Sequence, residues 1–168
     1  MKTIAFIGPR GSGKSTLGMW LAQTLAVPFV DTDAAVLDAL CATSVKQVWA
    51  TDGEQVWRDA EARVIPPLLK AQGVVALGGG APMLEEVSAA LEEVPMVIHL
   101  WGDPDVLYAR QHAEDDRPPL TQGDLGFSLH RTLRYRALST AELDTSSEYE
   151  VTQAALLSIV QEASTQSS

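Results

Sequence analysis

The segment Gly8–Thr16, GPRGSGKST, organises this chain. It follows a short apolar run, Ile4–Ile7, and leads into a helical pattern of apolar residues, and this context favours reading G-x-x-x-x-G-K-S as a phosphate-binding loop. Glycine permits positive φ angles and lets backbone N–H groups approach phosphate oxygens, while the following helix directs its positive end at the same anion. The segment predicts a nucleoside triphosphate site; the alternative is a glycine-rich turn that happens to precede a helix.

Two side chains of this loop carry the expected chemistry. Lys14 supplies a mobile cation for the β- and γ-phosphates, and the Ser15 hydroxyl supplies a ligand for Mg²⁺, which we expect as the cofactor that accompanies ATP. The residues expected to bind the nucleotide here are Gly11, Ser12, Gly13, Lys14, Ser15 and Thr16.

Length and composition indicate one globular domain over residues 1–168. The chain has 168 residues, of which 46% are apolar and 20% charged. No apolar run is long enough to span a bilayer, the stretch before Gly8 is too short for a signal peptide, and Cys41 has no second cysteine to pair with. We therefore expect a cytoplasmic protein, and a monomer. A net charge of −10 argues against nucleic acid or an anionic membrane as the partner.

Apolar runs alternate with helical patterns along the chain. Strands are expected at Ile4–Ile7, Phe29–Val30, Val74–Leu77, Met96–Leu100 and, from a weaker signal, Tyr149–Val151. The first four runs are uninterrupted, as in parallel strands that are covered on both faces. Helices are expected near 14–26, 34–41, 54–65, 83–93, 104–112, 125–137 and 152–163, with Pro66 and Pro67 ending or kinking the third. The pattern predicts a doubly wound α/β sheet.

Two carboxylates follow the second expected strand. Asp31 and Asp33 are spaced by two, so in extended chain their side chains point the same way. At the carboxyl end of a parallel strand beside a phosphate loop they would face the ligand crevice, where one can hold Mg²⁺ and the other meet a substrate hydroxyl. The alternative for Asp33 is a helix N-cap.

Other candidate site residues occur further along the chain. Arg58 and Glu61 share a helix face, although a pair of this kind is usually an exposed surface pair. The run Gly78–Gly80 ends a strand and suits a close approach of backbone to ligand. A charged, proline-rich stretch at about 112–124 reads as a lid, with Arg117 able to reach the γ-phosphate. Basic residues gather again at Arg131, Arg134 and Arg136, whereas His99, His112 and His130 are expected to be structural.

Taken in order and at their spacing, these motifs resemble the shikimate kinase family from Gly8 to about Arg136. The resemblance rests on the phosphate loop, Asp31-Thr32-Asp33, Gly53-Glu54-x-x-Trp57-Arg58-x-x-Glu61, Gly78–Gly80, Asp116-Arg117-Pro118-Pro119-Leu120 and Arg136. It implies a P-loop kinase fold with sheet order 2-3-1-4-5, a helical substrate-binding lobe at about 33–61 and a lid. It also implies ATP-dependent phosphorylation of the shikimate 3-hydroxyl, giving shikimate 3-phosphate, a step of aromatic amino-acid biosynthesis.

The resemblance also implies roles for individual residues. Asp31 helps hold Mg²⁺, and Asp33 meets the ring hydroxyls of shikimate. Arg58 and Arg136 bind the shikimate carboxylate, Glu61 orients either Arg58 or the ring end of the site, and the backbone of Gly79 and Gly80 contacts the substrate. Arg110 flanks the adenine. The catalytic residues that the resemblance implies are Lys14, Asp33 and Arg117.

Three features depart from the family pattern. The Asn-Arg pair usual after the glycine run has no counterpart in Ala81–Ala90, Ala137-Leu138-Ser139 stands where Pro-Leu-Tyr is usual, and Trp57 replaces a usual Phe. Two other functions stay open from the sequence: another small-molecule P-loop kinase, such as a gluconate kinase, and a non-catalytic ATP-binding module. Intact Lys14, Ser15, Asp33 and Arg117 argue against the second.

Overall fold

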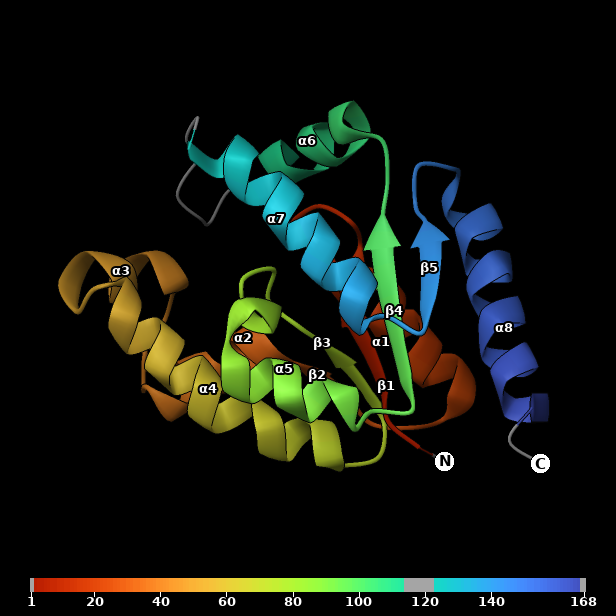
Figure 1. Ribbon diagram of the computed structural model, residues 1–168, viewed down its shortest axis with the longest axis horizontal. Helices are drawn as coiled ribbons and strands as arrows, with labels where there is room; N and C mark the ends of the chain where they lie inside the picture. Colours follow the sequence, from red (N-terminus) through yellow and green to blue (C-terminus); the bar gives the residue numbers. More distant parts are fainter. Residues whose placement is uncertain (1, 114–122, 167–168) are drawn as a thin grey trace.

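The computed structural model describes residues 2–113 and 123–166, which form a five-stranded parallel sheet flanked by helices (Figure 1). The strand order is β2-β3-β1-β4-β5, as the sequence predicts. The strands are β1 (Ile4–Ile7), β2 (Phe29–Asp31), β3 (Val74–Ala76), β4 (Met96–Trp101) and β5 (Ala141–Asp144). The register sets Asp31 of β2 level with Ala76 of β3, and Phe6 of β1 level with Ala76 on its other side. The ends of β1, β2 and β3 therefore form one edge.

Nine helical segments complete the part of the chain that the structure describes. They are α1 (Lys14–Leu25), α2 (Thr32–Ala39), α3 (Val45–Thr51), α4 (Glu54–Lys70), the 3-10 turn η1 (Ala81–Met83), α5 (Glu85–Glu92), α6 (Pro104–Ala113), α7 (Gly123–Leu138) and α8 (Tyr149–Gln166). Among these described helices, none is both long and apolar enough to cross a membrane.

Helices cover both faces of the sheet, and each face has its own core. On one face, Ala5 and Ile7 of β1 pack with residues of α4, α5 and α7. On the other, Ile4 and Phe6 pack with residues of α1 and α8. Alternate residues of one strand thus enter two different cores, which explains the uninterrupted apolar run in the sequence.

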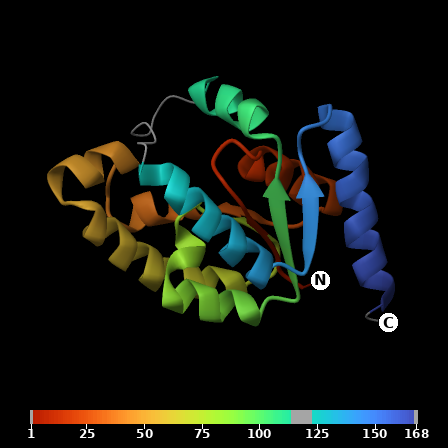
Figure 2. The same cartoon turned by 45° about the horizontal axis from the view of Figure 1, so that its top comes forward.

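The predicted substrate-binding lobe is built from α2, α3 and α4, which extend from the sheet (Figures 1 and 2). Its small core joins Val36, Val48, Trp57 and Ala60, and Trp57 is only 2% exposed. The large ring at position 57 therefore fills the core of the lobe. Helix α3, which the sequence did not lead us to expect, is capped by Ser44, whose hydroxyl accepts a hydrogen bond from the backbone N–H of Gln47.

One expected strand is misplaced, and the helix that begins near Glu54 does not end at Pro66 and Pro67, which was one of the two outcomes expected there. The fifth strand is Ala141–Asp144, and Tyr149–Val151 instead begins α8. At this sheet edge only Leu143 of β5 is buried, so the strand lacks the apolar run that marks the others. Helix α4 also continues through Pro66 and Pro67 to Lys70. Its last turns stay ordered because Ile65 and Leu69 are buried in the sheet-facing core.

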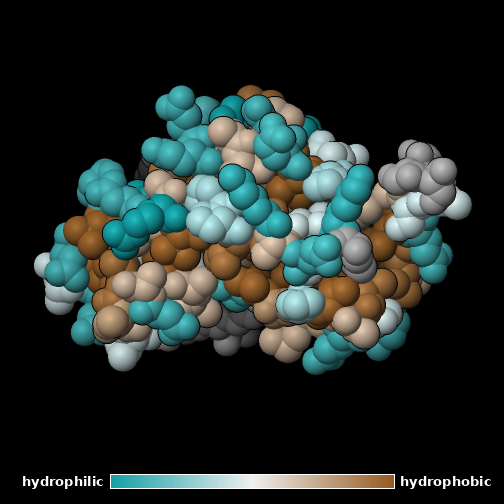
Figure 3. Space-filling model, turned by 90° about the horizontal axis from the view of Figure 1, so that it is seen from below, coloured by the Kyte–Doolittle hydropathy of each residue, from teal (hydrophilic) through white to brown (hydrophobic). Residues whose placement is uncertain are grey.

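The surface is mixed in character. Seen from below, apolar and hydrophilic residues are interspersed (Figure 3). At the opposite end of the molecule, the carboxyl ends of the strands point towards α6 and the start of α7 (Figure 1). From there α7 runs back along the sheet, so successive turns of α7 lie progressively further from that edge.

Candidate active site

The phosphate loop has the backbone that its glycines predict. Gly11 has a φ of 79°, and a Cβ atom at that position would lie 2.5 Å from the carbonyl oxygen of Leu107 on α6. Gly8 has a φ of 145°, and a Cβ atom there would lie 2.2 Å from the carbonyl oxygen of Leu100 on β4. Both positions thus combine a left-handed backbone with close contact to a neighbouring main chain. The loop then opens directly into α1 at Lys14.

The functional side chains of the loop lie at its mouth. Lys14 Nζ donates to the carbonyl oxygens of Gly8 at 2.9 Å and Pro9 at 2.8 Å, so the ammonium group lies over the loop. The hydroxyl of Ser15 donates to Asp31 Oδ2 at 2.5 Å. One hydroxyl and one carboxylate oxygen therefore meet at the carboxyl end of β2, as a Mg²⁺ site beside a bound triphosphate requires.

Asp31 is also the N-cap of α2. Its Oδ1 accepts a hydrogen bond of 3.0 Å from the backbone N–H of Asp33. The alternative reading of Asp33 as the N-cap is therefore wrong, and Asp33 lies in the first turn of α2. Asp33 also lines the pocket beside the phosphate loop.

A pocket of about 580 Å³ extends from the phosphate loop in two directions. Towards β2 and β3 it is lined by Asp31, Asp33, Leu77 and Gly78. In the other direction it is lined by Arg110, Thr145, Ser147, Tyr149 and Thr152. All six loop residues expected to bind the nucleotide line the pocket between these ends. The pocket therefore has room for a nucleotide along the loop and an acceptor beside Asp33.

The distal end of this pocket includes residues that the sequence analysis missed. Arg110 Nη2 donates to the backbone carbonyl of Thr145 at 2.8 Å, which ties α6 to the segment after β5. Ser147, Tyr149 and Thr152 lie on the same side. Their only sequence signal is the position after a parallel strand, and the weak strand expected at Tyr149–Val151 obscured that signal.

At the β3 end of the pocket, Gly78 lies against two carboxylates. A Cβ atom at this position would lie 2.4 Å from Asp33 Oδ1 and 3.4 Å from Glu61 Oε1. The backbone N–H of Gly78 donates to Thr32 Oγ1 at 3.0 Å, which fixes the glycine run against the start of α2. The missing side chain at Gly78 therefore allows α2, α4 and the strand β3 to come together here, while the approach of this backbone to a ligand stays a prediction.

Arg58 is held by three neighbours. Its Nη1 lies 2.7 Å from Glu61 Oε2, its Nη2 lies 2.9 Å from Glu54 Oε1, and its Cζ lies 5.6 Å from the centroid of the Trp49 ring. The side chain of Arg58 is 16% exposed. This is a preorganised guanidinium rather than the exposed surface pair that the sequence allowed as an alternative.

Burial changes the protonation equilibrium of this pair. Burial raises the pKa of Glu61, which is 1% exposed, and the nearby charge of Asp33 acts in the same sense, while Arg58 lowers it. For Arg58, burial acts to lower the pKa, but the charges and hydrogen bonds of Glu61 and Glu54 outweigh it and the pKa is raised. Arg58 therefore remains a cation, and Glu61 binds its proton more tightly than an exposed carboxyl group.

Helix α7 brings a second arginine to this region, and it is Arg131. Burial raises the pKa of Tyr135 to about 12, and the charges of Arg131 and Arg58 both act on that hydroxyl in the opposite sense. Tyr135 donates to the backbone carbonyl of Gly79 at 2.6 Å. Arg131 lies one helical turn before Tyr135, towards the ligand edge. Tyr135 and Arg58 thus lie against the glycine run, and the charge of Arg131 acts on Tyr135 beside it.

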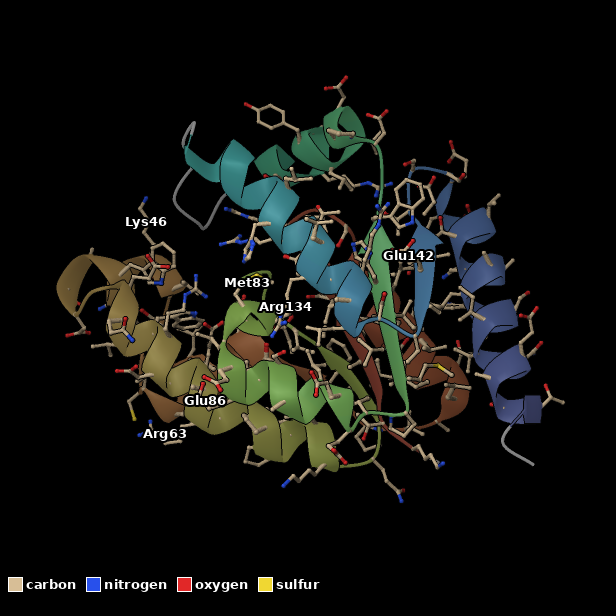
Figure 4. The ribbon with its side chains drawn as sticks, viewed as in Figure 1. Lys46, Arg63, Met83, Glu86, Arg134 and Glu142 are labelled. Atoms are coloured by element: carbon tan, nitrogen blue, oxygen red, sulfur yellow. The ribbon has the colours of Figure 1, made fainter. Side chains whose placement is uncertain are left out.

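Arg136, the residue expected from the resemblance, lies elsewhere. Its Nε donates to Glu142 Oε1 on β5 at 3.2 Å, and its side chain is 57% exposed. Glu142, labelled in Figure 4, lies on the β5 side of α7 and also contacts Nδ1 of the buried His99 at 3.1 Å. Because α7 runs away from the ligand edge, a residue five positions after Arg131 lies about 7.5 Å further along the helix.

When Arg131 is compared with the family's arginine after the lid in place of Arg136, the residues to compare with Pro-Leu-Tyr also lie earlier in the chain. The tyrosine usual after that arginine has a counterpart in Tyr135, so Ala137-Leu138-Ser139 is not the segment to compare. Among the other basic residues, Arg134 points from α7 to Ser88 on α5, while Lys46 and Arg63 point outwards from the lobe (Figure 4). Arg117 and most of the expected lid at 112–124 lie outside the described residues.

Known proteins are similar to this chain in sequence. The model of the shikimate kinase family matches residues 10–163. A shikimate kinase of Nitrobacter winogradskyi is 38% identical over 136 residues, which are 80% of this chain and 63% of that protein. A shikimate kinase of Ruegeria pomeroyi is 35% identical over 144 residues, covering 85% and 73% of the two chains.

Solved structures are similar over nearly the whole chain. A shikimate kinase from Acinetobacter baumannii in complex with shikimate has a TM-score of 0.83 and 25% identity, covering 96% of this chain and 94% of that one. A gluconokinase from Sinorhizobium meliloti has a TM-score of 0.58 and 19% identity, covering 99% and 98%. The second similarity concerns the fold alone.

Proposed function

Since the chain belongs to the shikimate kinase family, we propose that it transfers the γ-phosphoryl group of ATP to the 3-hydroxyl of shikimate. The product is shikimate 3-phosphate, an intermediate of aromatic amino-acid biosynthesis. The observation that carries the proposal is the arrangement around Gly78–Gly80: Asp33 lies against Gly78, and Arg58 lies against Gly80. Asp33, which we propose binds the hydroxyl, and Arg58, which we propose binds the carboxylate, therefore lie against one short turn, and this supports the proposal.

The nucleotide end of the site would hold ATP with Mg²⁺. Ser15 Oγ and Asp31 Oδ2, 2.5 Å apart, would hold the ion, and they fit Mg²⁺ because that ion usually takes few protein ligands and completes its shell with phosphate oxygens and water. Bound there, Mg²⁺ supplies charge neutralisation for the phosphates. Lys14 leaves the carbonyl oxygens of Gly8 and Pro9 and donates to the β- and γ-phosphates.

The acceptor end holds a small carboxylic acid by its charged group. Arg58 and Arg131 approach from α4 and α7 and donate to the shikimate carboxylate, with Glu61 and Glu54 fixing the orientation of Arg58. Two guanidinium groups from different elements grip one end of a rigid ring, so the reacting hydroxyl is directed by the geometry of the ring. Backbone groups of Gly79 and Gly80 complete the contacts of the ring.

Asp33 then aligns the hydroxyl that reacts. Its carboxylate lies between the Gly78 turn and the phosphate loop, so it accepts a hydrogen bond from the 3-hydroxyl and takes the proton as the bond to phosphorus forms. Arg110 flanks the adenine from the distal end of the pocket. Arg117, outside the described residues, is proposed to reach the transferred phosphoryl group from the lid.

We also propose in what form and where the chain acts. The chain acts as a single domain over residues 1–168 and as a monomer in the cytoplasm, on the small-molecule substrates ATP and shikimate. The chain has 22 acidic and 12 basic residues, and this negative net charge supports small-molecule partners rather than nucleic acid or an anionic membrane.

The experiment that tests the acceptor measures ADP release from Mg-ATP with shikimate, with gluconate and with no acceptor. Stimulation by shikimate alone supports the proposal. Stimulation by gluconate alone would identify the chain as another small-acid kinase. ATP binding without stimulation by either acid would identify a non-catalytic nucleotide-binding module.

A further inference from the structure

The turn Gly78–Gly80 is fixed at two of its three residues by groups on other elements. The backbone N–H of Gly78 donates to Thr32 Oγ1 on α2, and the backbone carbonyl of Gly79 accepts from Tyr135 on α7 at 2.6 Å. The carbonyl of Gly78 accepts from the N–H of Ala81, which closes the turn. The acceptor contacts assigned to this backbone therefore depend on side chains that do not touch the acceptor.

The bond from Tyr135 has a defined consequence for Gly80. The peptide bond between Gly79 and Gly80 is trans, so the carbonyl oxygen of Gly79 and the N–H of Gly80 point in opposite directions. With the oxygen directed at the Tyr135 hydroxyl, the N–H of Gly80 is directed away from α7. Gly80 itself lies against Arg58, since a Cβ atom there would lie 2.4 Å from Nη1.

The surroundings of Tyr135 make this bond durable. Tyr135 is 1% exposed, and its ring packs against that of His99, with centroids 5.3 Å apart. Burial raises its pKa to about 12, so the hydroxyl is a proton donor throughout the neutral range. Because Tyr135 is buried, its hydroxyl would be left without a partner if this bond opened, so the bond is costly to break.

We propose that Tyr135 is a positioning residue of the acceptor site, whose hydroxyl fixes the Gly79–Gly80 peptide so that the N–H of Gly80 is presented to the acceptor beside Arg58. This inference rests on the proposed function, because it takes the acceptor to lie against that turn. It also assigns helix α7 two tasks in the same site: Arg131 binds the acceptor carboxylate, and Tyr135, one turn later, sets the backbone donor.

The test compares Tyr135→Phe with a matched control, Thr140→Val. Thr140 follows the end of α7, and its Oγ1 accepts from the backbone N–H of Val97 on β4 and donates to the carbonyl of Val97, so this variant also loses side chain-to-backbone hydrogen bonding, away from the turn. Tyr135→Phe is expected to raise KM for shikimate about tenfold, with KM for ATP and kcat changed by less than about twofold. Thr140→Val is expected to leave both KM values unchanged.

A second measurement does not depend on turnover. In the wild-type protein, adding shikimate is expected to shift the NMR resonance of the Gly80 amide, and this shift is expected to be lost in Tyr135→Phe. An unchanged KM for shikimate in Tyr135→Phe, an equal rise in Thr140→Val, or a retained Gly80 shift would overturn the inference while wild-type turnover stands. Wild-type protein that shows no shikimate-dependent turnover would overturn the proposed function and this inference with it.

Discussion

Gly80 lies directly against the guanidinium group of Arg58, with no room for a side chain between them. A Cβ atom at Gly80 would lie 2.4 Å from Nη1, 2.7 Å from Nη2 and 2.8 Å from Cζ. The end of a free arginine would move aside at little cost, but Glu61, Glu54 and Trp49 hold this one. The guanidinium group of Arg58, the proposed acceptor-binding cation, can therefore take this position only because residue 80 has no side chain.

Replacing Gly80 by alanine is expected to displace that cation. We expect Gly80→Ala to raise KM for shikimate at least about tenfold while KM for ATP stays within about twofold, because the phosphate loop is untouched. Steady-state kinetics with each substrate varied checks this. Gly79→Ala is the matched comparison, since its Cβ atom would lie no closer than 3.6 Å to a neighbour, and its effect is expected to be smaller. Equal effects of the two variants would contradict the account.

The two arginines of α7 are expected to behave differently. Arg131→Ala is expected to raise KM for shikimate about 100-fold, because it removes one of the two cations that grip the carboxylate. Arg136→Ala removes an exposed pair with Glu142 and is expected to change the same constant by less than about threefold. The reverse order would restore Arg136 as the substrate residue.

That assignment shows where sequence reasoning loses precision. The loop Gly8–Thr16 could be predicted because its backbone conformation demands particular residues at fixed spacing. Arg131, Arg134 and Arg136 occur within two helical turns, and nothing in the chain itself says which face of α7 meets the sheet. Only the packing of Tyr135 into the core, with its hydroxyl on Gly79, decides that Arg131 faces the site.

Strand β5 and the distal pocket were missed for a related reason. An edge strand with one buried residue, Leu143, carries little apolar signal. The short run Tyr149–Val151 carries a weak strand signal, although it begins α8. Thr145, Ser147 and Thr152 are small polar residues whose role comes from their position after that strand. The acidic pair Asp31 and Asp33, in contrast, could be predicted, since it stands at the carboxyl end of a short apolar strand near the phosphate loop.

The cation–π contact between Trp49 and Arg58 makes a prediction about the lobe. The ring centroid of Trp49 lies 5.6 Å from Arg58 Cζ, a contact of about 0.5–2 kcal/mol. We expect Trp49→Leu to raise KM for shikimate about threefold to tenfold, and Trp49→Phe to lie between it and the wild type. Kinetics of the three proteins checks the order. If Trp49→Leu matches the wild type, the ring does not hold Arg58.

Glu61 is expected to lower the free energy of unfolding as the pH rises, which is opposite to the usual effect of a carboxyl group. Because burial raises its pKa in the folded chain, the folded state binds this proton more tightly than the unfolded state. The resulting stabilisation is complete at pH values below the pKa that Glu61 has in the unfolded chain. It is lost as the pH rises through the pKa that Glu61 has in the folded chain. Glu61→Gln cannot titrate at this position. The difference in Tm, wild type minus variant, should therefore fall as the pH rises from about 4 to about 7.

Thermal melts of both proteins across that range check the prediction. Groups far from Glu61 titrate in both proteins, so their effects cancel in the difference. A difference that grows with pH would contradict it, because it would mean that the charge of Arg58 outweighs burial and lowers the pKa of Glu61.

The central claim is that the chain places a phosphoryl group on one hydroxyl of shikimate, and the most direct measurement is the structure of the product. Phosphorus-31 and proton NMR of a reaction with Mg-ATP and shikimate locates the new ester bond through its phosphorus–proton coupling. The account predicts one product, with coupling to the proton on carbon 3. Inorganic phosphate as the sole product, or an ester at another hydroxyl, would contradict it.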